Sequence, residues 1–134
     1  MTIHAVADTH ALLWYLYDDP KLSATAANLM DSIIAAGDQV AISSIVLAEV
    51  LYLTEKGRIH AAALDHIFAV LRQTHPALVE IPLDQMVVKA MRRIDRLQVP
   101  DLPDRIVAAT ALHLGVPIIS RDRKIKAAVL NTIW

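Results

Sequence analysis

One stretch of the chain reads Val40-Ala41-Ile42-Ser43-Ser44-Ile45-Val46-Leu47-Ala48-Glu49-Val50-Leu51-Tyr52-Leu53. Its first three residues predict a buried strand, and Ser43 or Ser44 is suited to cap a helix that ends near Gly57. Glu49 lies in the middle of that helix, among apolar neighbours. Burying an unpaired carboxylate costs several kcal/mol at least, and a shared divalent cation is the simplest group that offsets the cost. The stretch therefore indicates a metal-dependent enzyme.

The same alternation of apolar strand and amphipathic helix continues on both sides of this stretch. Short apolar runs predict strands at residues 3–7, 40–42, 78–81, 116–120 and 132–134. Apolar stripes with polar caps and glycine or proline stops predict helices at residues 11–17, 23–37, 43–57, 64–71, 87–97, 103–115 and 121–128. Alternating elements of this kind predict an α/β fold whose mostly parallel sheet has helices on both faces.

Length and composition limit the class of protein. A chain of 134 residues fits a single domain, residues 1–134, with one sizeable core. Hydrophobic residues make up 55% and aromatic residues only 4%, so some aliphatic surface is expected to be covered by a partner or a second copy. The absence of cysteine excludes disulfides and thiolate metal sites. Without a membrane-spanning run or the features of a signal peptide, we expect a soluble, cytoplasmic protein.

Charge is distributed unevenly along the chain although the net charge is only −1. Residues 1–88 carry four basic and ten acidic side chains, whereas residues 89–134 carry nine basic and four acidic ones. Such an asymmetry is typical of a protein with one face that binds a polyanion. An ordinary solvated set of surface charges is the alternative interpretation.

Four acidic residues are expected to meet at one edge of the predicted sheet. Asp8 follows the first strand, Asp122 follows the fourth, Asp104 lies in the first turn of a helix, and Glu49 can lean back toward the sheet from its own helix. Ligands of open parallel sheets bind beyond the carboxyl ends of the strands. Carboxylate oxygens without histidine or cysteine suit Mg²⁺ or Mn²⁺ better than Zn²⁺.

Four segments carry a resemblance to a known family: Asp8-Thr9-His10-Ala11-Leu12-Leu13-Trp14, Ser43-Ser44-Ile45-Val46-Leu47-Ala48-Glu49-Val50, Pro103-Asp104-Arg105-Ile106-Val107-Ala108-Ala109-Thr110-Ala111 and Ile118-Ile119-Ser120-Arg121-Asp122. In this order and at this chain length, the sequence resembles a PIN-domain ribonuclease, most closely the VapC toxin of VapBC type II toxin–antitoxin pairs. The resemblance implies a three-layer α/β/α sandwich with strand order 3-2-1-4-5. It also implies a Mg²⁺- or Mn²⁺-dependent endoribonuclease that is silenced by a cognate antitoxin and forms a homodimer.

The resemblance, together with the positions of neighbouring residues, suggests roles for residues of this chain. Asp8, Glu49, Asp104 and Asp122 match the family's acidic catalytic quartet, with Asp8 and Asp104 as the main metal ligands and the other two completing the metal site. Thr9, Ser43, Asp101 and Ser120 are expected to support those carboxylates. Arg105, Arg121, Arg123 and Lys124 are candidates for contacts with RNA phosphates. The antitoxin groove is expected along residues 12–17 and 45–53.

Structural interpretations remain open for the same residues. Asp8 also fits a helix N-cap, Asp104 a favourable charge at a helix N-terminus, and Asp122 a turn residue. For Glu49 the alternative is a buried ion pair with Arg105. The six histidines are interpreted as structural or surface residues. The aromatic residues at positions 14, 15 and 17 could stack on RNA bases, but a core or interface role is favoured.

Other classes of function remain possible. A phosphoryl-accepting receiver domain would need an aspartate at the end of the third strand, where Pro82 stands, and an acid phosphatase would need an Asp-x-Asp motif after the first strand. A PIN nuclease of RNA processing and an inactive PIN-like module that binds RNA or protein remain alternatives. Metal-dependent RNA cleavage that is lost on replacing Asp8 or Asp104 separates an active nuclease from the inactive module.

Overall fold

The computed structural model describes residues 1–128 and 131–134. Five strands form one sheet in the order β3-β2-β1-β4-β5, and all four neighbouring pairs are parallel. The strands are β1 (Ile3–Ala7), β2 (Gln39–Ser43), β3 (Leu78–Ile81), β4 (Ile118–Ile119) and β5 (Thr132–Ile133). The predicted strand order is confirmed, and the fourth strand is shorter than the apolar run suggested.

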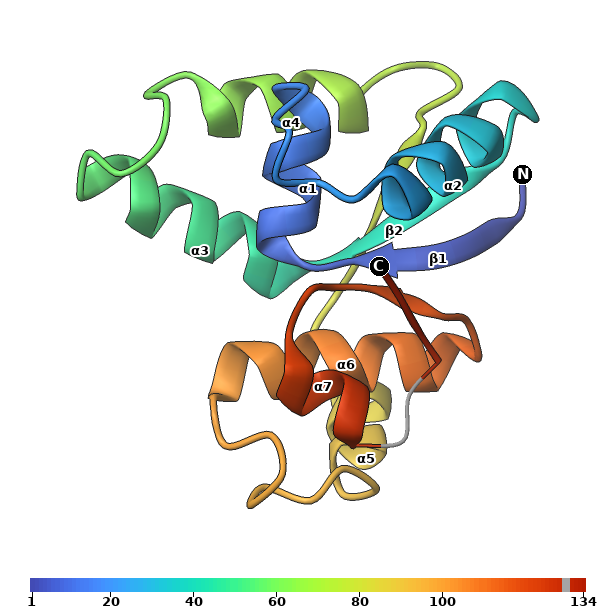
Figure 1. Cartoon of the computed structure of the whole chain (residues 1–134), viewed down its shortest axis with the longest axis vertical. Coiled ribbons are helices and arrows are strands. Elements are labelled where there is room, and N and C mark those ends of the chain that lie inside the picture. The colour runs from blue at the N-terminus through green and yellow to red at the C-terminus, as the bar shows by residue number, and fades with distance from the viewer. Residues whose placement is uncertain (129–130) are drawn as a thin grey trace.

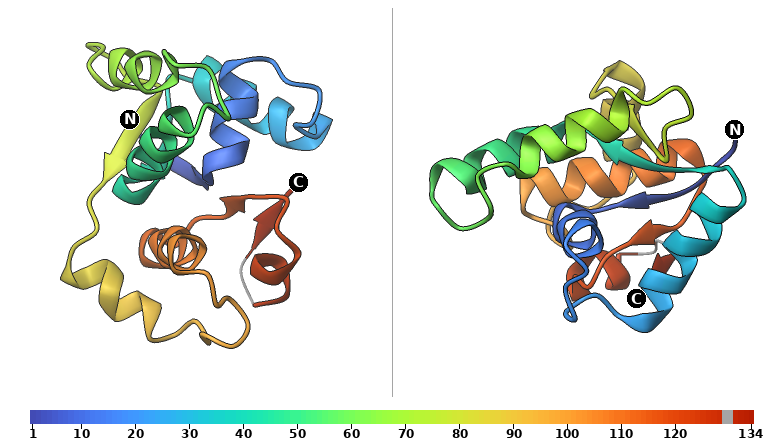
Figure 2. Two further views of the ribbon diagram at one scale, coloured as in Figure 1. Left: turned by 90° about the vertical axis from the view of Figure 1, so that its left-hand side faces the viewer. Right: turned by 90° about the horizontal axis from the view of Figure 1, so that it is seen from above.

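Helices cover both faces of this sheet. They are α1 (Thr9–Leu16), α2 (Ala24–Ala35), α3 (Ser44–Glu55), α4 (Ala63–Leu71), α5 (Gln85–Met91), α6 (Leu102–Leu114) and α7 (Arg123–Ala127). Helices α1 to α4 lie on one side of β1 and β2, and α5 to α7 lie on the other (Figures 1 and 2). The predicted three-layer α/β/α sandwich is confirmed. Among the described residues, no helix is long and apolar enough to cross a membrane.

The central strands and α6 form the middle of the core. Every residue of β2 is buried, as are Ala5–Ala7 of β1, which explains why these strands are apolar without alternation. Helix α6 packs on both strands through a run of buried residues that includes Ala108, Ala109 and Ala111. Small side chains at these positions let the backbone of α6 pack closely against the sheet.

The register of the strands brings several helix starts to one edge of the sheet. Ala7 of β1 pairs with Ile119 of β4, and Val6 pairs with Ala41 of β2. The backbone N–H of Asp8 donates to the carbonyl of Ile119 at 3.1 Å, so the chain that leaves β1 stays beside the chain that leaves β4. The segments after β1, β2 and β4 therefore emerge together.

The helix predicted at residues 87–97 is shorter in the structure, where α5 ends at Met91. Arg105 of α6 donates from Nη2 to the carbonyl of Met91 at 2.8 Å and from Nε to the carbonyl of Ile94 at 3.1 Å. The carboxylate of Asp95 accepts from the backbone N–H of Leu97 at 2.8 Å, a local bond that competes with the helix. Leu97, which the stripe placed in the core, is 80% exposed. The predicted helix was too long. Arg105, eleven or more residues further along the chain, donates to the carbonyls of Met91 and Ile94, so these carbonyls have partners although α5 does not continue.

Candidate active site

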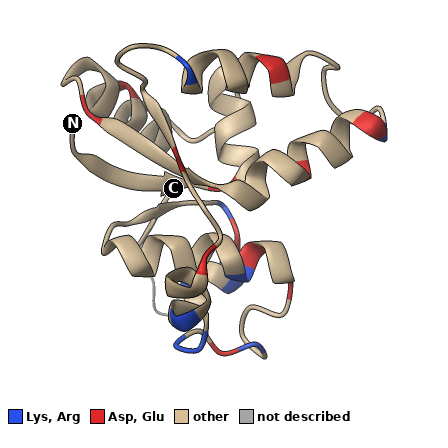
Figure 3. Cartoon of the chain, turned by 180° about the vertical axis from the view of Figure 1, so that it is seen from behind, with Lys and Arg blue, Asp and Glu red and all other residues tan. Residues whose placement is uncertain are grey.

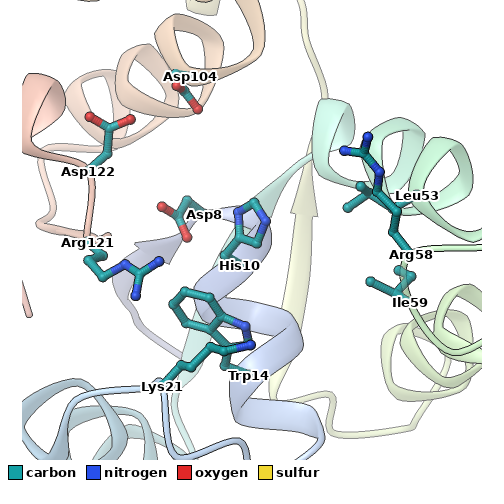
Figure 4. A pocket seen from close by; sticks show the side chains of 10 residues that line it. All are labelled: Asp8, His10, Trp14, Lys21, Leu53, Arg58, Ile59, Asp104, Arg121 and Asp122. Carbon is teal, nitrogen blue, oxygen red and sulfur yellow. The ribbon is translucent and has the colours of Figure 1, made fainter. Parts of the chain in front are cut away.

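Three of the four predicted catalytic carboxylates line one cleft. Asp8, Asp104 and Asp122 face a cavity of about 560 Å³ (Figure 4), and they reach it from the β1–α1 junction, from α6 and from the β4–α7 junction. The rest of the lining comes from His10, Trp14, Lys21, Leu53, Arg58, Ile59 and Arg121. The cleft thus has a carboxylate-rich wall and cationic and apolar residues around the remainder of its rim.

Asp8 and Asp122 have the same local role, which is to begin a helix. Asp8 is the N-cap of α1 and accepts from the backbone N–H of Ala11 at 2.8 Å. Asp122 is the N-cap of α7 and accepts from the N–H groups of Lys124 at 2.7 Å and Ile125 at 3.3 Å. The capping interpretation is therefore correct for Asp8, and Asp122 also proves to be a cap. Each cap uses only Oδ1, so capping is compatible with a second role for the carboxylate.

Asp104 lies one turn beyond the cap of its helix. The N-cap of α6 is Asp101, whose carboxylate accepts from the backbone N–H of Asp104 at 3.1 Å, and Pro103 occupies the first turn. Asp104 is not used as a cap, and its half-buried side chain lies in the cleft wall. Its position near the positive end of the α6 dipole favours the ionised form, but this is only one of the influences on its charge.

Glu49 is held by a neutral donor and not by a cation. Thr9, which is buried, donates from Oγ1 to Glu49 Oε1 at 2.7 Å and so connects α3 to the start of α1 beside Asp8. The proposed ion pair with Arg105 is wrong, because the Arg105 guanidinium is bonded to carbonyls of the α5–α6 segment. Glu49 is half-buried, and Leu51 and Tyr52 nearby are exposed, so its surroundings are wetter than the apolar run implied.

The carboxylates raise one another's pKa. Burial raises the pKa of Asp104 to about 7, with further contributions from the charges of Asp101, Asp122 and Glu49 and from a hydrogen bond shared with Asp122. Burial also raises the pKa of Asp8, although bonds from Ser120 and Ala11 partly oppose the effect. The hydrogen bonds around these carboxylates therefore do not fully offset the effects of burial and mutual repulsion on their ionised forms.

The pKa of Glu49 is raised by burial as well, and the bond from Thr9 lowers it only in part. The negative charge of Asp101 and Asp8 acts in the same direction as burial. Glu49 does not line the cleft directly, but the electrostatic influence of Asp8 on Glu49 and of Glu49 on Asp104 places it in the same group of carboxylates. Three of the four predicted carboxylates thus line the cleft, and Glu49 lies near enough to interact with them electrostatically.

The donor chemistry of this group fits a hard divalent cation. Its members offer only oxygen, and an additional positive charge would relieve the repulsion that raises their pKa values. Within the part of the chain that the structure describes, no three histidine, aspartate or glutamate side chains already surround a single metal position. The residues fit a divalent ion by type and charge, not by a finished coordination geometry.

The four residues predicted to support the carboxylates differ in what they contact. Thr9 donates to Glu49, and Ser120 bonds to Asp8 while its Oγ accepts from the backbone N–H of Asp122 at 3.0 Å. Ser43 is buried and caps α3, accepting from the N–H of Ile45 at 3.3 Å. Asp101 caps α6 and raises the pKa of Asp104. Thr9 and Ser120 touch predicted site carboxylates directly, and the other two position helices.

Basic residues of the C-terminal third gather in space as well as in sequence. Seen from behind, Lys and Arg are concentrated in the half of the molecule that carries α5 to α7 (Figure 3). Of the four predicted phosphate contacts, only Arg121 lines the cleft; Arg123 and Lys124 are exposed on α7 outside it. Arg105 does not line the cleft, and its guanidinium donates to the carbonyls of Met91 and Ile94, so its contact with RNA stays a prediction.

Several residues that line the cleft were not predicted as site residues. His10 and Trp14 were interpreted as structural, and Lys21 and Arg58 were not singled out. The only sequence feature that could have indicated His10 as a site residue was its position two residues after Asp8. Lys21 and Arg58 lie in connections between helices, where no periodic pattern shows the direction of a side chain.

The chain belongs to the PIN-domain family, since the model of the PIN domain matches residues 5–129. This match confirms the resemblance carried by the four segments quoted above. Among curated proteins, none matches the chain significantly.

Solved structures of similar fold cover almost the whole chain. VapBC2 from Rickettsia felis, bound to a DNA fragment from its promoter, contains a chain that is 18% identical, with a TM-score of 0.71, over 98% of this chain and 100% of that one. A toxin–antitoxin complex from Klebsiella pneumoniae gives 21% identity and a TM-score of 0.66 over 97% and 96%. FitAcB from Neisseria gonorrhoeae gives 20% and 0.62 over 96% and 95%. At these identities the likeness establishes the fold.

Proposed function

We propose that this protein is a Mg²⁺- or Mn²⁺-dependent endoribonuclease and the toxin of a toxin–antitoxin pair. The proposal is carried by one observation: three carboxylates from separate elements line one cleft, and a fourth, Glu49, interacts with them electrostatically from beside it. No basic side chain of the described residues forms an ion pair with these four, and three of them have raised pKa values. A structural cluster of this kind would be expected to contain its own cations. Membership in the PIN family supports a hydrolase of the nuclease class.

In this proposal Asp8 and Asp104 are the main metal ligands, and Glu49 and Asp122 complete the site directly or through water. Small side-chain rotations would be enough, because each capping bond uses only one oxygen of Asp8 and Asp122. A bound divalent ion supplies an activated water and neutralises charge on the phosphodiester. The expected products carry a 5′ phosphate and a 3′ hydroxyl.

The chain's own residues prepare the site for this chemistry. Thr9 fixes Glu49 by donating to Oε1, and Ser120 holds Asp8 while it also accepts from the backbone of Asp122. Hydrogen-bonded neighbours of this kind set the orientation of ligating carboxylates. Because the pKa of Asp104 is about 7, cation binding at neutral pH would displace a proton that Asp104 partly retains.

A protein partner is the second part of the proposal. One of the structures of similar fold is a toxin–antitoxin complex. On the two helices where the sequence placed the antitoxin groove, Leu12 and Leu13 are buried, but Tyr17 at the end of α1 and Leu51 and Tyr52 of α3 are exposed. These exposed apolar side chains support a protein contact, with an antitoxin and with a second copy in a cytoplasmic homodimer as the proposed partners.

Cleavage of a single-stranded RNA by the purified protein tests the nuclease assignment. We expect cleavage with Mg²⁺ or Mn²⁺ and none in EDTA, and we expect Asp8→Asn and Asp104→Asn to lower the rate by about a hundredfold or more, because each removes a ligand charge. Asp84→Asn is the matched control, since Asp84 is an exposed N-cap outside the cleft. Cleavage that survives EDTA, or that both cleft variants retain, would contradict the assignment.

Growth on induction tests the toxin assignment separately. We expect expression of the wild-type protein to arrest growth, expression of Asp104→Asn to leave growth unaffected, and co-expression of the product of the adjoining reading frame to restore growth. Metal-dependent RNA cleavage in vitro without growth arrest would instead favour a nuclease of RNA processing. A purified complex that no longer cleaves RNA would show that the partner acts on the active site.

A further inference from the structure

Arg121 lies among carboxylates but is not paired with any of them. Its side chain lines the cleft together with Asp8, Asp104 and Asp122 (Figure 4), and the described residues contain no ion pair at Arg121. Its guanidinium carbon instead stands 4.7 Å from the centroid of the Trp14 ring. An arginine stacked on an indole is held by the negative face of the ring while its N–H donors remain free.

Trp14 is itself held in place. The His10 ring lies 5.5 Å from the Trp14 ring, and the Trp134 ring meets it edge-on at 5.8 Å. Trp14 is half-buried on α1, whose first turn begins at the N-cap Asp8. The indole therefore has a fixed position relative to Asp8, and so does the cation that it carries.

The backbone of Arg121 is fixed by bonds that also hold predicted site carboxylates. Ser120 donates from its backbone N–H to the carbonyl of Ile133 at 3.2 Å, and its side chain bonds to Asp8 and to the backbone of Asp122. With the backbone anchored, the position of the guanidinium depends only on the side-chain torsions of Arg121. Without the stack on Trp14, an arginine adjacent in sequence to Asp122 would be drawn to the carboxylates, because opposite charges in a partly desolvated cleft attract strongly.

We propose that Trp14 is a positioning residue that keeps Arg121 off the carboxylates and holds its guanidinium at the mouth of the cleft, where it binds the phosphodiester backbone of RNA. This inference rests on the proposed function and deepens it. An Arg121–carboxylate pair would occupy both the oxygens needed for a cation and the donors needed for a phosphate. The stack on Trp14 prevents both losses at once.

A double-mutant cycle between Trp14 and Arg121 tests the proposal. The variants are Trp14→Leu, which keeps apolar volume but removes the π face, Trp14→Phe, which retains a smaller face, Arg121→Ala and the double variant Trp14→Leu/Arg121→Ala. Affinity for Mn²⁺ is measured without RNA, from the rise in melting temperature during a titration. Affinity for a single-stranded RNA oligonucleotide is measured in EDTA, by fluorescence anisotropy at several salt concentrations.

We expect Trp14→Leu to weaken Mn²⁺ binding by about fivefold, because the released Arg121 then competes with the cation for the carboxylates. The double variant should regain wild-type Mn²⁺ affinity, and Trp14→Phe should lie between wild type and Trp14→Leu. Recovery of metal binding on removing a second residue is not expected if Trp14 only stabilises the fold. Wild-type Mn²⁺ affinity in Trp14→Leu, or equal weakening in the double variant, would overturn the proposal.

RNA binding gives the second readout. Arg121→Ala should weaken binding by about tenfold and lower the salt slope by roughly 0.7, the value for one phosphate contact on a single strand. Trp14→Leu should weaken RNA binding as well, by a smaller factor. Arg72→Ala is the matched control, because Arg72 is an exposed arginine at the end of α4 that does not line the cleft. Equal losses in Arg121→Ala and Arg72→Ala would contradict a specific role for Arg121.

The outcomes separate this inference from the proposed function. RNA cleavage by the wild type together with normal Mn²⁺ binding in Trp14→Leu would leave the nuclease assignment standing and remove the role of Trp14. The rescue pattern in the Mn²⁺ titration without RNA cleavage by the wild type would support the positioning role and remove the nuclease assignment. A circular dichroism spectrum and a melting temperature in EDTA establish that each variant is folded, and Trp14→Phe remains informative if Trp14→Leu is not.

Discussion

The starts of α5 and α7 are built in the same way and lie in different surroundings. Asp84 begins α5 and accepts from two backbone N–H groups at 3.0 and 3.1 Å, and Asp122 begins α7 and accepts from two at 2.7 and 3.3 Å. Asp84 is exposed on the surface away from the cleft. Asp122 lies in the cleft wall, where it shares a hydrogen bond with Asp104 and contributes to the raised pKa of Asp8.

The comparison shows that local structure does not separate a capping aspartate from a candidate ligand. Both residues satisfy free N–H groups at a helix start, and the short backbone pattern around them is alike. The difference lies in the other carboxylates that come near, and these belong to segments distant in the sequence. Repulsion between neighbouring carboxylates favours the binding of a cation, and an isolated carboxylate on the surface lacks this contribution.

The largest expected effect comes from changing the two caps in parallel. Asparagine caps a helix about as well as aspartate, so neither Asp84→Asn nor Asp122→Asn should lower stability appreciably. We expect Asp122→Asn to lower the rate of metal-dependent RNA cleavage by roughly a hundredfold, and Asp84→Asn to leave it unchanged. Initial rates at saturating Mn²⁺, with melting temperatures of both variants, give the comparison. Equal rates for the two variants would indicate that Asp122, like Asp84, serves only as a helix N-cap.

A smaller effect is expected from the threonine that bonds to Glu49. Thr9→Val keeps the shape of the side chain but removes the donor to Glu49 Oε1, so Glu49 loses the bond that orients it and partly opposes its raised pKa. We expect the cleavage rate to fall by about tenfold. Thr54→Val is the matched control. Thr54 lies in α3, the helix of Glu49, and its hydroxyl donates to the carbonyl of Leu51 and not to a carboxylate. A similar loss in both variants would point to helix stability as the cause.

The smallest effect concerns the stability of the metal-free protein. With a pKa of about 7 in the folded state and 3.8 as the ordinary value, Asp104 stabilises the fold only in its protonated form, at low pH, and this contribution is lost as the pH rises toward 7. Asn at this position does not titrate. The melting temperature of Asp104→Asn relative to wild type, in EDTA, should therefore rise between about pH 4 and pH 7 and stay level above pH 7. Solvent screening at a half-exposed group keeps the change small, and a constant difference would contradict the raised pKa.

Most of the fold follows from local patterns of sequence. One error, in the length of a predicted helix, shows what such patterns do not determine. The apolar runs and helix caps predicted the strands and the order of elements, because both depend on neighbours along the chain. The stripe from Val87 to Leu97 predicted a longer helix than α5. It failed because Arg105, from α6, bonds to the carbonyls of Met91 and Ile94 and so stabilises an end that the stripe does not mark.

The candidate site was predicted in part. The four carboxylates were identified from their places after strands and in helices. The structure places three of them in one cleft and Glu49 near enough to influence Asp104 electrostatically. The rest of the cleft rim was not predicted, because Lys21 and Arg58 come from connections between helices. Arg105 was expected to face RNA or Glu49, and it faces the α5–α6 segment instead, since an arginine can reach several partners and sequence position does not choose among them.

The sequence by itself determined which residues begin helices, which runs are buried in the sheet, and which carboxylates stand near strand ends. Those properties arise from hydrogen bonds and hydrophobic patterns within a few residues. Only the tertiary structure decided that Asp104 stays partly protonated near neutral pH, that Thr9 rather than Arg105 holds Glu49, and that Arg121 rests on Trp14. Burial and charge–charge interaction depend on distances in space, so they appear only after segments far apart in the chain have packed together.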